Sequence, residues 1–211
     1  MPAPITSLRV RKLFLISLLF AGVPTRVPAQ STLADSSIHP PPAITPSQRF
    51  QWFTINTVGP PSLAAGVVSA GWGTLYNSPH EYGPHWDGFG QRYGMRLTGV
   101  ATSNAIEAGL GAIWHEDPRY SRVGPGSFGR RVRHIFVMTF MASDGRGGLM
   151  PAYARYTAIS GNNFLSNAWR EQSEATISRA LIRTGLGFLG RLSSNAFGEF
   201  WPDVKQRLRR H

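Results

Sequence analysis

Apolar residues recur at helical intervals in the last third of the chain. Between residues 177 and 204 they lie three to seven positions apart, as one face of a helix requires. Pro202 falls near the end of this pattern and predicts a kink or a new helix start there. The same period runs from residue 89 to 114, which predicts one long helix or a broken pair.

Three further segments complete the helical pattern. Residues 62–76 lie inside a stretch without charge from residue 50 to 79, and shorter apolar segments cover 134–142 and 153–169. The chain is therefore predicted to be mainly α, a glycine-rich bundle of four to six helices that is membrane-associated. Glycine- and proline-rich turns are expected at 77–88, 121–129 and 144–151.

An outer-membrane β-barrel is the alternative architecture. Residues 89–98 alternate between large apolar side chains and Gly, Arg or Thr, as a membrane-spanning strand does. A barrel needs at least eight such strands, and the alternation does not return at a regular spacing. The helical bundle is therefore favoured.

Small residues recur at four-residue spacing on three of the predicted helices. On helices such rows let backbones approach closely, as they do between helices in lipid, although a chain with 23 glycines contains some rows by chance. The rows are Ala65, Ser69, Gly73; Gly66, Ala70, Thr74; Ala101, Ala105, Gly109; and Gly190, Ser194, Gly198.

The N-terminus has the pattern of a cleavable export signal. Arg9, Arg11 and Lys12 precede an uncharged apolar run at residues 13–23, and small residues at 27–29 suit cleavage after Ala29. This run is too short for a membrane-spanning helix, which needs about 20 apolar residues. We therefore expect the protein to be exported to the periplasm or the outer membrane.

The domain organisation follows from the signal and from the segment after it. Residues 1–29 are the predicted signal peptide, and residues 30–48 are a Ser/Pro-rich linker with almost no apolar periodicity. Residues 49–208 are predicted to form a single helical domain, because no second linker of this kind interrupts them.

Composition limits the chemistry and points to anionic partners. Cleavage would remove four basic residues and no acid, which lowers the net charge from +11 to +7. Nearly all the remaining basic residues are arginines, which bind carboxylates and phosphates through two hydrogen bonds. The chain has no cysteine, so disulfides, thiol nucleophiles and thiolate metal sites are excluded.

Basic residues form the best-supported candidate site. Those near the turn at 124–127 and at the C-terminus are predicted to bind anionic groups, although a solvated face is the ordinary fate of such charges. Phe200 and Trp201 beside the C-terminal charges also suggest a helix that anchors at a membrane surface. The predicted anion-binding residues are Arg119, Arg122, Arg130, Arg131, Arg133, Lys205 and Arg207.

Two clusters of histidines and acids are weaker candidates. His115, Glu116 and Asp117 are the candidate catalytic residues, and His80 and His85 together with His115 are the candidate metal ligands. Their spacing matches no established zinc template, so no metal and no cofactor are expected. The ordinary alternative for these residues is a turn and a helix end in which Asp117 pairs with Arg119.

Ser-Asn-Ala followed by an apolar residue occurs three times, beginning at Ser103, Ser166 and Ser194. In one interpretation each Asn points inward and hydrogen-bonds a neighbouring helix. In the other, each Asn caps or ends its own helix. The sequence alone does not separate the two.

Several short motifs together resemble a protein family. They are Gly88 to Gly94, Ser103-Asn104, His115 to Tyr120 with its Asp-Pro-Arg-Tyr core, Gly126 to Gly129, Ser166 to Ala168, and Glu199-Phe200-Trp201-Pro202-Asp203. Over residues 50 to 205 the chain resembles an uncharacterised family of exported proteins from acidobacteria-type bacteria. The resemblance implies no activity. It implies only that these motifs belong together in one kind of protein.

The predicted function is that of an exported cell-envelope protein with a structural or binding role. Its expected partners are a membrane and anionic lipid or an anionic envelope polymer, with no nucleic acid. A non-enzymatic role is favoured. The alternative is a periplasmic hydrolase that depends on a metal or on the His and carboxylate clusters.

Overall fold

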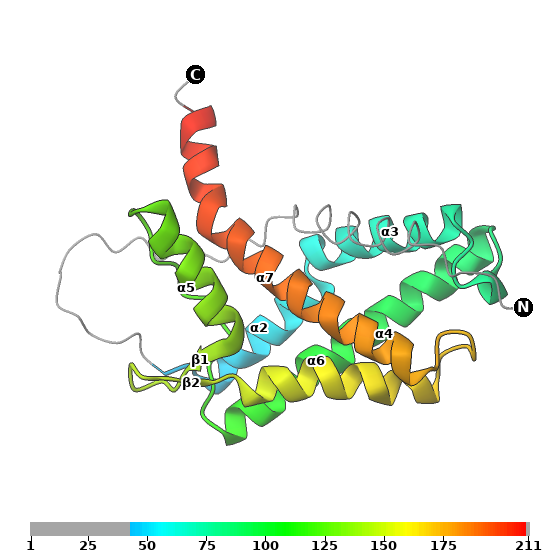
Figure 1. Cartoon of the computed structure of the whole chain (residues 1–211), viewed down its shortest axis with the longest axis horizontal. Helices are drawn as coiled ribbons and strands as arrows, with labels where there is room; N and C mark the ends of the chain where they lie inside the picture. Colours follow the sequence, from blue (N-terminus) through cyan, green and yellow to red (C-terminus); the bar gives the residue numbers. More distant parts are fainter. Residues whose placement is uncertain (1–42, 210–211) are drawn as a thin grey trace, which may run out of the picture.

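The computed structural model describes residues 43–209, so the predicted signal peptide and most of the predicted linker lie outside the described residues. Mainly helical structure is confirmed: six α-helices and one two-stranded sheet form within this range (Figure 1). The elements are α2 (Pro46–Val58), α3 (Pro60–Leu75), α4 (Trp86–Ile113), α5 (Phe128–Phe140), β1 (Met141–Ser143), β2 (Leu149–Pro151), α6 (Tyr153–Leu165) and α7 (Ile177–Leu208).

Helix α2 begins inside the segment that the sequence assigned to the linker. The Thr45 hydroxyl accepts a hydrogen bond from the Gln48 backbone N–H, and the Gln48 side chain accepts one from the Thr45 N–H. This capping box and Pro46 in the first turn start the helix. The helical structure therefore starts at Pro46, three residues before the predicted domain boundary.

The two longest predicted helices are continuous. Helix α4 is one helix of 28 residues, and it contains the residues 89–98 whose alternation suggested a strand. Helix α7 runs for 32 residues through Pro202. Its C-terminal end extends beyond the rest of the described chain (Figure 1).

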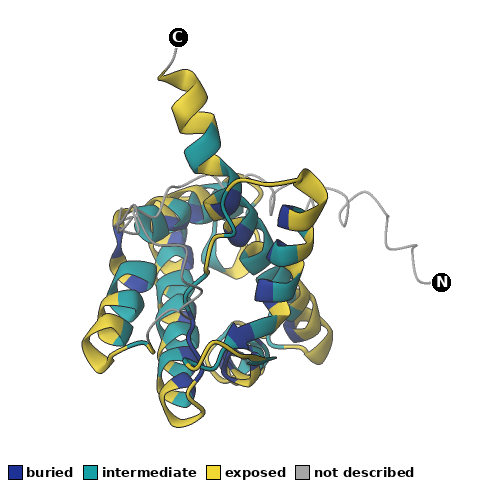
Figure 2. Cartoon of the chain, turned by 90° about the vertical axis from the view of Figure 1, so that its left-hand side faces the viewer, coloured by how far each residue is buried: buried dark blue, intermediate teal, exposed yellow. Residues whose placement is uncertain are grey.

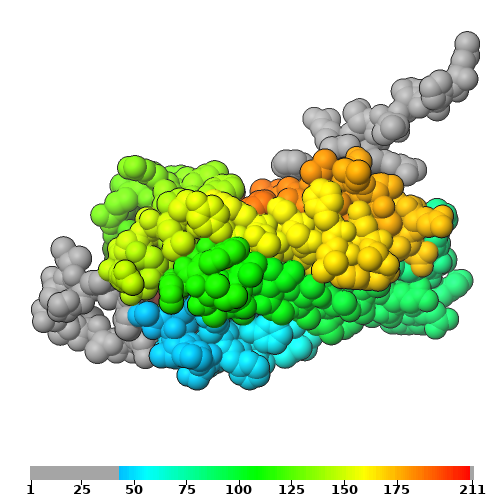
Figure 3. Space-filling view, turned by 90° about the horizontal axis from the view of Figure 1, so that it is seen from below, coloured from blue at the N-terminus to red at the C-terminus, as the bar shows by residue number. Residues whose placement is uncertain are grey.

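Helix α4 is the centre of the packing. Helices α2, α3 and α6 pack against it, and α7 packs against α5 and α6. From below, α2, α4 and α6 lie side by side across the molecule (Figure 3). Helix α3 approaches α4 closely because Gly66 faces the Tyr93 ring and Gly73 faces the Arg92 side chain.

A short hairpin follows α5, where the sequence pattern predicted helix as far as residue 142. Strands β1 and β2 pair antiparallel, with Met141 opposite Pro151. Gly145 and Gly147 adopt positive φ in the connecting turn, and the Asp144 carboxylate accepts hydrogen bonds from the N–H groups of Arg146 and Gly148.

The interior of the described chain is unusual in its composition. Its buried apolar residues are six alanines together with Ile135, Met138 and Ile159. Seven charged residues are buried with them: Arg92, Glu107, Glu116, Asp117, Arg131, Arg155 and Glu199. Large apolar side chains are instead exposed on every helix, and the buried positions line only the inner helix faces (Figure 2). Within residues 43–209, no helix combines the length and the apolar character needed to cross a bilayer.

Two of the three Ser-Asn-Ala asparagines join neighbouring helices. Asn104 of α4 donates to the Thr57 hydroxyl of α2 at 3.1 Å, and Asn195 of α7 donates to the Thr139 hydroxyl of α5 at 3.0 Å. Asn167 follows α6 and accepts a hydrogen bond from Arg183. In α4 and α7 the geometry therefore agrees with the inward interpretation.

Candidate functional site

The segment between α4 and α5 is held against α7 by a buried carboxylate. Glu199 has no exposed surface. It accepts hydrogen bonds from the Tyr120 hydroxyl at 2.8 Å, the Val123 N–H at 3.2 Å and Arg131 Nε at 2.9 Å. The Asp-Pro-Arg-Tyr motif and the C-terminal Glu-Phe-Trp-Pro-Asp motif thus meet in space.

Asp203 extends this network by one helical turn. Its two carboxylate oxygens accept hydrogen bonds from Arg122 and Arg131, each at 2.5 Å. Burial alone would raise the pKa of Glu199, but the hydrogen bonds from Tyr120 and Arg131 hold it below its usual value. Hydrogen bonding to Arg131 similarly lowers the pKa of Asp203. Both groups are therefore carboxylates that neutralise arginines.

The structure divides the predicted anion-binding residues into two groups. Three of them form ion pairs with acids. Arg119 pairs with Asp117, Arg122 pairs with Asp203, and Arg131 pairs with both Glu199 and Asp203. Arg130 is exposed and donates to the Pro125 carbonyl. Arg133, Lys205 and Arg207 are exposed and form no ion pair among the described residues.

The C-terminal end of α7 has an apolar stripe. At 100° per residue, Phe197, Trp201, Val204 and Leu208 fall within about 60° of one another. Trp201 is 36% exposed and Leu208 is 69% exposed. Lys205 and Arg207 flank the stripe, while Glu199 and Asp203 occupy the other side of the helix and bind Arg131.

The start of α5 adjoins this part of α7. The rings of Phe128 and Phe200 stack at 5.6 Å, and the Arg131 guanidinium lies 4.4 Å above the Phe200 ring. Phe128 remains 71% exposed. We call this region the α5–α7 tip: Phe128, Arg130, Trp201, Val204, Lys205, Arg207 and Leu208.

The histidine and acid clusters do not share a site. His85 precedes the first residue of α4 and His115 follows its last turn, which places them about 40 Å apart. The Glu116 carboxylate is buried and accepts hydrogen bonds from the Ala154 N–H, while burial raises its pKa. In the part of the chain that the structure describes, no three His, Asp or Glu side chains are grouped to hold a metal ion.

No family model, curated protein or solved structure matches this chain.

A second buried network was not anticipated from the sequence. Glu107 Oε1 accepts hydrogen bonds from Arg155 Nε at 3.0 Å and from Arg191 Nη2 at 2.9 Å. The three residues lie on α4, α6 and α7, and each is the only charged residue in a long segment of its helix. That isolation was the available signal, because a lone charge in an apolar segment requires a partner.

Proposed function

We propose that the protein is an exported component of the cell envelope that attaches to an anionic membrane surface through the α5–α7 tip. The observation that carries this proposal is the apolar stripe of α7 with Lys205 and Arg207 on its two sides. A helix of this pattern lies in the plane of the membrane interface, with its apolar side chains among the acyl chains and its basic groups at the phosphates.

The ion pairs of α7 support the same orientation. Glu199 and Asp203 face α5 and the segment before it, where their charges neutralise Arg131 of α5 and Arg122 of that segment. The acids on this part of α7 therefore point away from the proposed membrane surface. Lys205 and Arg207 remain available for lipid phosphates.

Both contributions are needed for stable attachment. Each basic residue close to an anionic surface contributes about 1 kcal/mol, and this contribution weakens as salt screens the charges. Trp201, Val204 and Leu208 add the apolar contribution, and Trp is well suited to the interface because one ring edge is polar. This kind of attachment, at the membrane surface, does not need a helix that crosses the bilayer.

Flotation with lipid vesicles tests the proposal directly. The chain from Gln30 onward is mixed with phosphatidylcholine vesicles that contain or lack phosphatidylglycerol. We expect it to float with the anionic vesicles and to be released by high salt. Replacing Lys205 and Arg207 together by Gln removes about 2 kcal/mol, so binding should fall about 30-fold.

Two matched controls distinguish attachment through the tip from non-specific adsorption to the vesicles. The charge-preserving pair Lys205→Arg with Arg207→Lys should bind normally. Val204→Gln with Leu208→Gln should weaken binding. Ile177→Gln with Leu181→Gln changes residues at the other end of α7 that are at least as exposed on average, and it should not weaken binding. Equal losses from both apolar pairs, or equal flotation with neutral vesicles, would overturn the proposal.

A further inference from the structure

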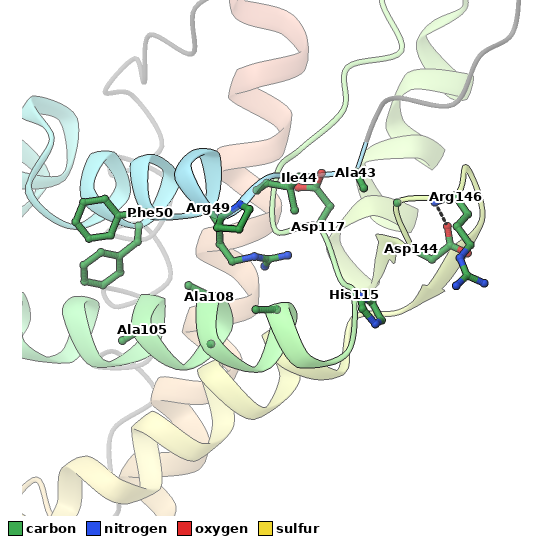
Figure 4. Close-up of a pocket in the computed structure, with 15 residues that line it drawn as sticks. Ala43, Ile44, Arg49, Phe50, Ala105, Ala108, His115, Asp117, Asp144 and Arg146 are labelled. Carbon is green, nitrogen blue, oxygen red and sulfur yellow. Dashed lines mark hydrogen bonds between the residues drawn. The ribbon is translucent and has the colours of Figure 1, made fainter.

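A cavity of about 590 Å³ lies between α2, the C-terminal half of α4 and the turn of the hairpin (Figure 4). Small residues of α4 form one wall: Ala105, Ala108, Gly109 and Ala112. Phe50 and Phe53 of α2 line the opposite wall. The small-residue wall is about 10 Å long, so the cavity is an open apolar groove about as long as an extended alkyl chain of eight to ten carbons.

An arginine lies at the charged end of this cavity. The Arg49 side chain extends from α2 toward α4 (Figure 4). Its Nη2 donates to the Glu116 carbonyl at 2.8 Å, while Nη1 is buried and has no hydrogen-bond partner among the described residues. Nη1 lies beside Gly111 and has almost no accessible surface, so a ligand in the cavity would meet the positive charge of the guanidinium and not this N–H itself.

The acidic side chains at the same end already have partners. Asp117 is bound by the Arg119 guanidinium and by the Arg119 N–H. Asp144 accepts the N–H groups of the hairpin turn. Arg146 is exposed at the cavity and forms no ion pair within residues 43–209. Arg49 and Arg146 therefore outnumber Asp144 among the side chains here that form no ion pair within residues 43–209, and the unpaired charge is net positive.

His115 adds a strained residue at the cavity. It follows the last turn of α4 with φ +62°, a left-handed conformation that glycine usually supplies at this position. A histidine in this conformation costs about 1 kcal/mol or more. This strained residue is one of those that line the cavity (Figure 4).

We infer that this cavity binds a single-chain amphiphile with an anionic head group. The alkyl chain would lie between the phenylalanines and the small residues of α4, and the carboxylate or phosphate head would lie near Arg49, His115 and Arg146. The volume is within the range of small-molecule sites, about 300–1,000 Å³. This site is separate from the α5–α7 tip and does not depend on membrane attachment.

Calorimetric titration of the chain from Gln30 onward with decanoate below its micelle concentration tests the inference. We expect saturable binding of one decanoate per protein, and at least tenfold weaker binding of decyltrimethylammonium, which has the same chain and the opposite charge. Decyl phosphate is titrated in parallel, and the tighter of the two anions identifies the head group. Absence of saturable binding by both anions would overturn the inference.

A cavity-filling variant locates the site. A Cβ atom on Gly109 would meet nothing within 4 Å, so Gly109→Leu begins its side chain in the open space of the cavity and takes up part of it. It should abolish decanoate binding. Gly94 lies on the same helix outside the cavity and is equally open, so Gly94→Leu is the matched control and should bind normally. Unchanged binding by Gly109→Leu would place the ligand elsewhere and refute the assignment.

Substitutions of Arg49 and His115, the residues near the proposed head group, should change binding in distinct ways. Arg49→Gln should weaken decanoate binding at least tenfold while leaving decanol binding unchanged, and Arg49→Lys should restore part of the loss. His115→Gly should raise the melting temperature, because glycine relieves the positive φ, and should weaken decanoate binding in the same protein. Equal losses for decanoate and decanol in Arg49→Gln would count against an anionic head group.

Discussion

The Tyr120 hydroxyl donates a 2.8 Å hydrogen bond to the buried carboxylate of Glu199, which lies 79 positions later in the chain. Arg131 reaches the same carboxylate from α5, so one acid joins three parts of the structure. Asp117 and Arg119 fix the turn that presents Tyr120. The two sequence motifs are therefore the two sides of one clamp, which sets the direction of the projecting end of α7.

Loss of this clamp should be measurable as stability. Tyr120→Phe leaves Glu199 Oε2 with only the Val123 N–H, and we expect a loss of about 1–3 kcal/mol in the free energy of unfolding by urea. Glu199→Gln should cost more, about 3–5 kcal/mol, because Arg131 is buried beside it. Glu171→Gln, at an exposed position, is the control and should change little. A Glu199→Gln protein as stable as this control would contradict the clamp.

The pH dependence of stability should follow the two carboxylates. Glu199 and Asp203 have folded-state pKa values below their ordinary values of 4.5 and 3.8. Acids shifted in this direction contribute stability that is complete above the ordinary pKa and is lost as the pH falls through the folded-state value. We therefore expect the free energy of unfolding to fall from about pH 5 downward.

The variant Glu199→Gln with Asp203→Asn isolates this contribution, since its unfolding free energy should depend less on pH over the same interval. Glu116 acts in the opposite direction, because burial raises its pKa and favours its protonated form in the folded state. An unchanged acid slope in the double variant would mean that other carboxylates control acid unfolding.

The sequence predicted the helices because their packing faces are long enough to show a period. Helix α4 and helix α7 each repeat the pattern over many turns. Helix α2 was missed because prolines before it suggested a linker, although Thr45 and Gln48 contain the capping signal. The hairpin was missed because three-residue strands are too short to alternate visibly.

The residues of the candidate site were harder to predict from the sequence, because spacing along the chain carries no information about partners that are distant in sequence. Arg131 and Arg133 look alike in the sequence, yet one is buried against Glu199 and the other is exposed. Only the crossing of α5 and α7 distinguishes them. The same limit hid Glu107, Arg155 and Arg191, whose shared contact exists only after three helices have packed.

The Glu107 network should be the more sensitive of the two interior networks. Glu107→Gln removes the only carboxylate that Arg155 and Arg191 contact within the described residues, and Arg155 is 2% exposed. We expect a loss of about 3–5 kcal/mol, because a buried arginine would remain without a counter-charge. The measurement is urea unfolding of Glu107→Gln beside Glu171→Gln.

A second variant separates the ion pair from the other hydrogen bonds of Arg155. Its Nη1 also donates to the carbonyls of Met138 and Thr139 near the end of α5. Arg155→Lys keeps the charge but cannot reproduce this fork, so it should lose stability even with Glu107 intact. Wild-type stability in Arg155→Lys would show that charge alone matters here.

Two glycines of α4 should respond in opposite ways to the same substitution. A Cβ atom on Gly88 would lie 2.2 Å from the Tyr82 carbonyl oxygen and 2.4 Å from that of Gly83, and backbone atoms cannot move away cheaply. Gly88→Ala should therefore destabilise the fold and disturb the Arg92 guanidinium, which binds the Gly83 carbonyl.

A Cβ atom on Gly94 meets nothing within 4 Å. Gly94→Ala should raise the free energy of unfolding by up to about 1 kcal/mol, because alanine favours the helix. Thermal unfolding of both proteins gives the comparison, and a stabilised Gly88→Ala protein would show that α4 does not approach residues 82 and 83 this closely.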